Sequence, residues 1–172
     1  MLYLKNHNSN FSNRIRPKVS WSVKNSSIIF NFEYENYLNF YVSDKFKEDY
    51  KENWGLWDFD VAEVFIKKEG EHYLEIQCSP LGQIFALIIK KPREEFFIPQ
   101  SLTSTGKVLS RDPLKIQFII DGSDIPGAGN KLYGNCYSCL GHDKRLFYGI
   151  NLNSEDICDF HKPSLFIEFT KE

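Results

Sequence analysis

The sequence of 172 residues lacks several features that would assign it to a functional class directly. With 21 basic and 23 acidic residues its formal net charge is −2, so it offers no electrostatic attraction to nucleic acid or to an anionic membrane. No apolar run approaches the roughly 20 residues of a transmembrane helix. The first ten residues, MLYLKNHNSN, hold no apolar segment behind a basic one and so show no signal peptide. These absences favour a cytoplasmic protein, or a mature form cut from a longer one.

Cysteine is scarce, and its spacing permits two interpretations. The four cysteines are Cys78, Cys136, Cys139 and Cys158, and without an export signal we expect free thiols. The spacing Cys136-x2-Cys139-x18-Cys158-x2-His161 falls within the range of zinc ribbons. Small core or turn residues are the favoured interpretation, because a chain of this length needs no metal to stabilise it and a strand-like segment interrupts the motif.

Aromatic side chains, by contrast, make up 16% of the chain, and they favour strands and recognition surfaces. Apolar residues recur with the periodicity or continuity of strands in several segments. These segments are 19–24, 28–34, 37–42, 60–66, 72–78, 83–91, 114–120, 131–138, 145–151 and 165–169. Turns at a spacing of about 8–12 residues separate them, so we predict one all-β domain over residues 1–172. It should be an antiparallel β-sandwich, jelly-roll or immunoglobulin-like, of about 8–11 strands with at most one or two short helices.

Three segments permit more than one structure. Residues 1–16 could be an irregular lead-in or an edge strand. Residues 43–53 could form a short helix or a surface loop with equal plausibility. The loop 121–130 carries Asp121 and Asp124, which could hold calcium, but no EF-hand spacing is present and two turn aspartates are the favoured interpretation.

The stretch 53–82 combines the features around which we expect the chain to be organised. Trp54 and Trp57 precede two strands joined by a short turn. Alternation assigns one face to the core: Ala62, Val64, Ile66, Leu74, Ile76 and Cys78. The other face carries Val61, Glu63, Phe65, Tyr73, Glu75 and Gln77, and it is either a binding surface or a solvated sheet face. Trp21, on an earlier strand, should lie in the core because it alternates with Val19 and Val23.

The register of this hairpin decides which polar groups meet. A turn centred near Glu69 places Glu63 directly across from Glu75, where like charges cost roughly 0.2–1 kcal/mol. A slip of one residue is barred because it would turn the core face to solvent. A shift of two residues pairs Glu63 with Gln77 and relieves the repulsion.

Three blocks of sequence resemble the family 9 carbohydrate-binding modules and the related DOMON-type domains. LWDFDVAEVFI with YLEIQCSPLG, in 56–82, is similar to the family's Trp–acidic–V-E-x-F hairpin. GNCYSC in 134–139, followed by RLFY in 145–148, resembles its G-N-x-Y-x-C segment, and DFHKPSLFIEF in 159–169 resembles its closing block. The resemblance implies a β-sandwich that binds a sugar, often a glycan end, and that is usually exported, in tension with the missing signal peptide.

The resemblance and the chemistry of sugars together predict the site residues. A pyranose has C–H groups on its faces and hydroxyls at its rim, so a site needs flat aromatic platforms and polar groups in the ring plane. We expect platforms from Trp57, Trp54 and Tyr148, and rim contacts from Glu63, Glu75, Gln77, Asn135 and Arg145. The chain departs from the family at Tyr148, where many members have Trp, and at Ile167, where the closing block has Gly.

These residues predict a non-catalytic carbohydrate-binding module with a carbohydrate ligand, or, as an alternative use of the same aromatics, a protein partner. A glycosidase would need Glu63 and Glu75 on facing strands about 5 Å apart, the spacing of a retaining pair. Some DOMON-type domains bind haem, but the one methionine is Met1 and no histidine lies in a haem motif. Haem is therefore disfavoured as a cofactor.

Overall fold

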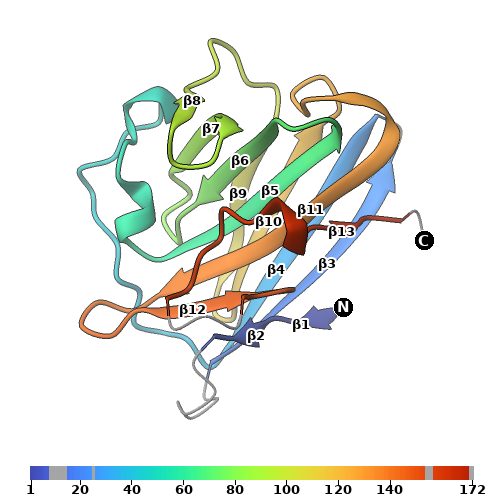
Figure 1. The fold of residues 1–172 in the computed structure, drawn as a ribbon. Helices are drawn as coiled ribbons and strands as arrows, with labels where there is room; N and C mark the ends of the chain where they lie inside the picture. Colours follow the sequence, from blue (N-terminus) through green and yellow to red (C-terminus); the bar gives the residue numbers. More distant parts are fainter. Residues whose placement is uncertain (8–14, 25, 154–156, 171–172) are drawn as a thin grey trace.

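The computed structural model describes residues 1–7, 15–24, 26–153 and 157–170, and within them the chain forms two antiparallel sheets packed face to face (Figure 1). Sheet A has the order β1-β3-β4-β10-β9, and sheet B the order β2-β12-β11-β5-β6-β7-β8, with β13 beside β11. The predicted antiparallel β-sandwich is confirmed. Among the described residues, no helix is long and apolar enough to span a membrane.

The strands of sheet A are β1 (Leu2–Tyr3), β3 (Arg16–Lys24), β4 (Ser27–Glu35), β9 (Thr105–Arg111) and β10 (Leu114–Asp121). Those of sheet B are β2 (Lys5–Asn6), β5 (Val61–Glu69), β6 (Tyr73–Cys78), β7 (Ile84–Lys91), β8 (Glu95–Phe97), β11 (Ala128–Leu140), β12 (Leu146–Gly149) and β13 (Ile167–Glu168). Three 3₁₀ turns complete the described elements: η1 (Tyr50–Glu52), η2 (Leu56–Asp58) and η3 (Pro163–Leu165).

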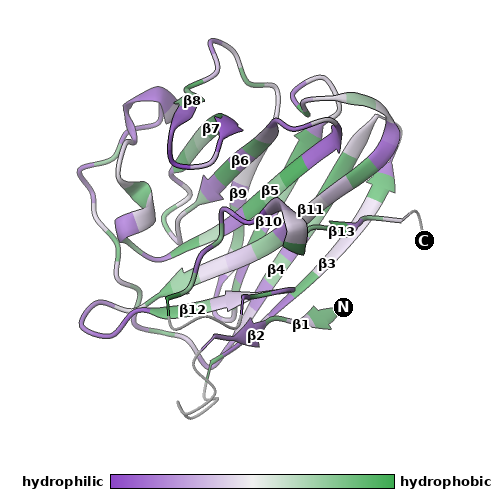
Figure 2. Cartoon of the chain, viewed as in Figure 1, coloured by the Kyte–Doolittle hydropathy of each residue, from purple (hydrophilic) through white to green (hydrophobic). Residues whose placement is uncertain are grey.

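The main core lies between the two sheets and follows from the period-two alternation of side chains on a strand. Along β4 and β10 every second residue is buried, and hydrophobic and hydrophilic bands alternate along the strands in Figure 2. The six residues assigned to the core face of β5 and β6 all belong to this core, as predicted. Trp21 is only partly buried against it, with its ring centroid 5.1 Å from that of Phe169.

Sheet B differs from a simple sandwich sheet because its second face is also covered. Every residue of β6 is buried, on both faces. The C-terminal segment that leads into η3 crosses this outer face, the one turned away from sheet A (Figure 1). Phe160 stacks on Tyr137 with ring centroids 4.0 Å apart, and Phe166 meets Tyr73 at 5.4 Å. A second apolar cluster therefore lies outside the sandwich.

One predicted strand is absent, since residues 37–42 form none. Of the two structures expected for 43–53, the loop is the one present, with the single turn η1 in it. The cause of the missing strand is the buried Asp60 carboxylate, which accepts hydrogen bonds from the Tyr37 hydroxyl and, at 2.7 Å, from the Tyr41 backbone N–H. The Asp60 N–H in turn donates to the Tyr41 carbonyl at 2.8 Å. Asp60, directly before β5, thus holds this segment through its carboxylate and one backbone hydrogen bond, without the regular pairing of a strand.

Candidate functional site

A cavity of about 360 Å³ opens on the outer face of sheet B. Its floor is formed by side chains of β5, β6, β7 and β11. Its walls come from three connections: the loop around η2 with Trp54 and Trp57, the β7–β8 region with Arg93 and Phe96, and the segment before η3, 158–161. Segments far apart in sequence therefore meet at one hollow over a buried sheet face, a common setting for small-molecule sites.

The floor carries three buried polar side chains, Glu63, Glu75 and Gln77, which are 3%, 4% and 1% exposed. The hairpin has the register in which Glu63 pairs with Gln77, while Phe65 pairs with Glu75. The two carboxylates are consequently diagonal neighbours and not directly opposed, which relieves the repulsion. Of the two interpretations of this face, the solvated one is wrong, because these side chains are buried beneath the covering loops. The binding surface stays a prediction.

Hydrogen bonding on the floor is incomplete. The Gln77 amide nitrogen donates to Glu75 Oε1 at 2.7 Å. Among the described residues, no donor is within hydrogen-bond distance of Glu75 Oε2 or Gln77 Oε1, although both atoms are buried. His161 Nε2 lies 3.9 Å from Glu75 Oε2, and Cys139 Sγ lies 4.0 Å from Glu63 Oε1. Because a buried acceptor without a donor costs about 1–3 kcal/mol, these atoms mark a place where a ligand can stabilise the protein.

Burial also changes the protonation of the floor. It raises the pKa of Glu75 to about 7, against the favourable hydrogen bond from Gln77. Burial first, and then the negative charge of Glu75, raise the pKa of Glu63 well above its ordinary value. Burial lowers the pKa of His161, so this imidazole is neutral at pH 7. The two neighbouring carboxyl groups therefore both favour the protonated form more than exposed glutamates do, and the charge of one affects the titration of the other.

The aromatic walls are partly open to solvent. Trp54 is 54% exposed and stacks on Phe96 at 5.9 Å, while it meets Trp57 edge to face at 4.9 Å. Trp57 in turn lies 5.5 Å from the buried Phe85. Trp57 is thus anchored in the outer apolar cluster, and Trp54 extends the wall outward.

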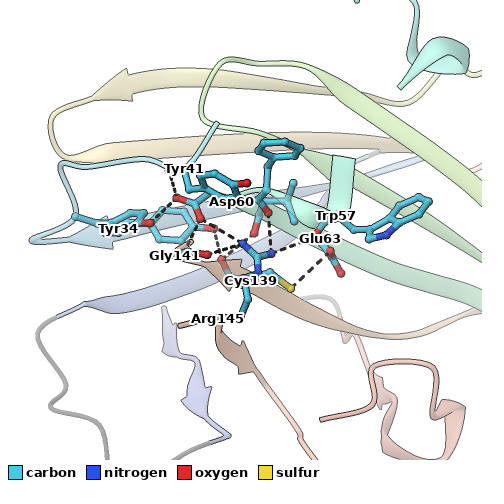
Figure 3. A network of polar contacts seen from close by, with 12 residues as sticks. Tyr34, Tyr41, Trp57, Asp60, Glu63, Cys139, Gly141 and Arg145 are labelled. Carbon is cyan, nitrogen blue, oxygen red and sulfur yellow. Dashed lines mark hydrogen bonds and ion pairs between the residues drawn. The ribbon is translucent and has the colours of Figure 1, made fainter. Parts of the chain in front are cut away.

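Arg145 lies beneath the η2 loop and positions it (Figure 3). Its guanidinium donates to the carbonyls of Trp57 at 3.0 Å, Phe59 at 2.9 Å and Gly141 at 3.0 Å. The same group lies 3.6 Å from the fully buried Asp60 carboxylate. A planar cation with several donors is suited to joining such carbonyls, so Arg145 fixes the backbone that carries Trp57.

The structure brings together five of the eight predicted site residues: Trp54, Trp57, Glu63, Glu75 and Gln77. Asn135, Arg145 and Tyr148 do not line this cavity. Asn135 is fully buried and donates to the Asn151 carbonyl at 2.8 Å, which ties down the segment after β12. Tyr148 belongs to the core between the sheets and is 3% exposed. Their positions fit roles in the scaffold.

The wall residues that sequence reasoning did not assign to the site include Arg93, Phe96, Cys158, Phe160 and His161. Phe96 lies in a segment without clear alternation of polar and apolar residues. Phe160 and His161 lie inside the closing block that carries the resemblance, DFHKPSLFIEF, so a signal for them was present. The sequence of this block, however, does not indicate that it crosses the outer face of sheet B.

The spacing that suggested a zinc ribbon does not form a metal site. Cys136 and Cys139 are both on β11, three residues apart, and successive strand residues point to opposite faces. Cys136 therefore lies in the inter-sheet core and Cys139 in the outer cluster. Among the described residues, no group of three or more His, Cys, Asp or Glu side chains is arranged to hold a metal ion.

The aspartates considered for calcium have turn contacts. Asp121 Oδ1 accepts from the Ser123 N–H at 2.9 Å, and Asp124 Oδ2 accepts from the Ser104 N–H at 2.6 Å. Asp121 thereby caps the turn of its own loop, as the favoured interpretation expected. Asp124 instead joins this loop to the segment that precedes β9.

Comparison with known proteins identifies a solved structure with a similar fold. No protein-family model matches the chain, and no curated protein matches it. A solved structure, "a putative carbohydrate-binding protein from Bacteroides uniformis ATCC 8492", superposes with a TM-score of 0.74. The match covers 99% of this chain and 85% of the other at 14% sequence identity. At that identity the two share the β-sandwich fold, while membership of the family 9 or DOMON-type group stays a prediction.

Proposed function

We propose that this chain is a non-catalytic carbohydrate-binding domain and that its site is the cavity on the outer face of sheet B. The observation that carries the proposal is the pairing, in one cavity, of partly exposed tryptophan walls with a buried polar floor. Its volume of about 360 Å³ lies at the lower end of the roughly 300–1,000 Å³ of small-molecule sites. This size favours one sugar ring, or the end of a glycan, over a long chain enclosed along its length.

The chemistry of the lining matches the two surfaces of a pyranose. The faces of the ring present C–H groups, which pack on flat aromatic side chains such as Trp54 and Trp57. The hydroxyls at the rim both donate and accept, and Glu75 with Gln77 offers free acceptors for them. Arg93 adds donors at the cavity wall. Shared architecture with a protein whose name describes carbohydrate binding gives the proposal further support.

The register weakens the case for a retaining glycosidase. That mechanism was inferred from Glu63 facing Glu75 directly, and Glu63 instead faces Gln77. Incubation with chromogenic glycosides separates binding from hydrolysis. We expect no release of chromophore above that of the Glu63→Gln variant, and a rate that falls with this substitution would identify an enzyme.

Tryptophan fluorescence tests the binding proposal. Two of the three tryptophans line the cavity, while Trp21 lies on sheet A. Titration with a panel of mono- and oligosaccharides should change the emission and saturate. Trp57→Ala should remove binding, and the matched variant Trp21→Phe should retain it. If no sugar produces a saturable change at millimolar concentration, the proposed function is wrong.

A further inference from the structure

The cavity floor presents more acceptors than donors. Glu75 Oε2 and Gln77 Oε1 have no donor within hydrogen-bond distance among the described residues, and both side chains are at least nine-tenths buried. Beside them, Glu63 Oε1 has Cys139 Sγ, a weak donor, at 4.0 Å. The one amide N–H₂ group on the floor already donates to Glu75 Oε1. When the carboxylates are ionised, a ligand that completes this arrangement must therefore bring donors.

We propose that the preferred ligand is an amino sugar, a hexose whose protonated amine is bound by Glu75 Oε2 and Gln77 Oε1. This inference rests on the proposed function and specifies its ligand class. An ammonium group supplies three donors and no acceptor, which matches the two free oxygens of the floor. Hydrogen bonds between charged groups are also stronger than those made by a hydroxyl.

The walls suit the remainder of the same ligand. Trp54 and Trp57 both line the cavity and offer flat aromatic faces. The ring carbons of an amino sugar pack on these faces while its amine reaches the floor. The aromatic walls and the acidic floor thus each contribute to binding one amphipathic cation.

The charged groups around the floor do not neutralise the ionised Glu75 carboxylate that an ammonium group would meet. Arg93, at the wall, donates to Asp159 at 2.8 Å, so its charge is partly balanced there. Arg145 donates hydrogen bonds to the backbone carbonyls of Trp57 and Phe59, and its guanidinium lies beside the Asp60 carboxylate. Burial lowers the pKa of His161, keeping it neutral, and raises the pKa values of Cys139 and Cys158, which therefore stay as thiols.

Protonation of the floor gives the proposal a measurable consequence. Burial raises the pKa of Glu75 to about 7, so at pH 6.5 much of it carries a proton in the empty protein. An ammonium group favours the ionised carboxylate, and its binding should therefore release a proton to the buffer. A neutral sugar offers only hydroxyl donors, which favour the ionised carboxylate less strongly, and should release fewer protons.

Isothermal titration calorimetry at pH 6.5 tests this with glucosamine, glucose and N-acetylglucosamine, in two buffers of different ionisation enthalpy. We expect glucosamine to bind about tenfold more tightly than either neutral sugar, with proton release. Glu75→Gln should remove the preference while keeping the shape of the side chain. Glu71→Gln, at an exposed position in the turn of the same hairpin, should leave it unchanged.

The outcomes distinguish this inference from the function on which it rests. If glucose or N-acetylglucosamine binds as tightly as glucosamine, the amino-sugar inference is wrong and carbohydrate binding stands. A preference that persists in Glu75→Gln, or binding without proton release in the unmodified protein, also overturns it. If none of the saccharide panel binds, both fail. The proton count needs no variant, so a poorly folding variant does not prevent the test.

Discussion

The two faces of the β5–β6 hairpin are both buried, yet they differ in how completely they are packed. The inner face, turned to sheet A, is wholly apolar and meets a complementary apolar sheet. The outer face is covered by loops and carries Glu63, Glu75 and Gln77 among aromatic rings, with acceptor atoms left without donors. One strand pair thus serves stability on one side and, in our proposal, ligand binding on the other. In that proposal, the binding face is marked by buried polar groups without partners and not by exposure to solvent.

The outer face depends on its covering loop, and Arg145 gives the largest predicted effect. Arg145→Gln removes three charged hydrogen bonds to carbonyls and leaves the buried Asp60 without its cation. Breaking such a buried pair costs roughly 3–5 kcal/mol. We expect that loss in the free energy of unfolding from urea denaturation, together with weaker sugar binding. An unchanged midpoint and unchanged binding would show that the loop is held in another way.

On the inner face, shortening an apolar side chain should lower the free energy of unfolding. Ile76→Ala, at a fully buried position, should cost about 2–5 kcal/mol in the free energy of unfolding because it leaves a cavity in a packed core. Its neighbour on the outer face, Gln77, has a free acceptor as well as its hydrogen bond to Glu75 Oε1. In Gln77→Leu the removal of the free acceptor offsets part of the loss of that hydrogen bond, so this variant should cost less than Ile76→Ala. Equal losses in the two variants would contradict the distinction between the faces.

The outer face should also be pH-sensitive. The pKa of Glu75 is raised from 4.5 to about 7, so the folded state holds this proton more tightly than the unfolded state. Stability contributed by Glu75 is therefore full below pH 4.5 and is lost as the pH rises through 7. Glu75→Gln cannot ionise and should be more stable than the parent at pH 8 by about 3 kcal/mol, with little difference at pH 4.5. Urea denaturation at both pH values measures this difference in the free energy of unfolding. The control variant Glu71→Gln should show no such dependence on pH relative to the parent.

The smallest stability effect is expected at the open wall. Trp54→Ala should change the free energy of unfolding by less than about 1 kcal/mol, because the side chain is 54% exposed. It should nevertheless weaken sugar binding through the loss of a platform. A large loss of stability with intact binding would assign Trp54 to the scaffold.

Period-two alternation was sufficient to predict the sandwich and the inner face, because inward side chains must be apolar wherever one sheet packs on another. It also left two registers for the hairpin, and the one that separates Glu63 from Glu75 is present. The prediction of a strand at 37–42 was wrong. Alternation within this segment carries no information about Asp60, later in the chain, whose carboxylate accepts hydrogen bonds from Tyr37 and Tyr41.

The site was predictable only in part. A local pattern identifies Trp54, Trp57 and the polar residues of the floor, because all of them lie in the one stretch 53–82. Arg145 and Asn135 have the polar groups of rim residues, yet their donors reach backbone carbonyls beneath the covering loops. The opposite wall, with Phe160 and His161, depends on how the C-terminal segment crosses sheet B, which is a tertiary property without a local signature.

The most direct test of the central claim is a crystal structure of the chain grown with the saccharide that binds most tightly in the fluorescence titration. We predict a sugar ring in the outer-face cavity, packed on Trp57, with a donor within hydrogen-bond distance of Glu75 Oε2 or Gln77 Oε1. A saccharide bound elsewhere, with this cavity empty, would contradict the account.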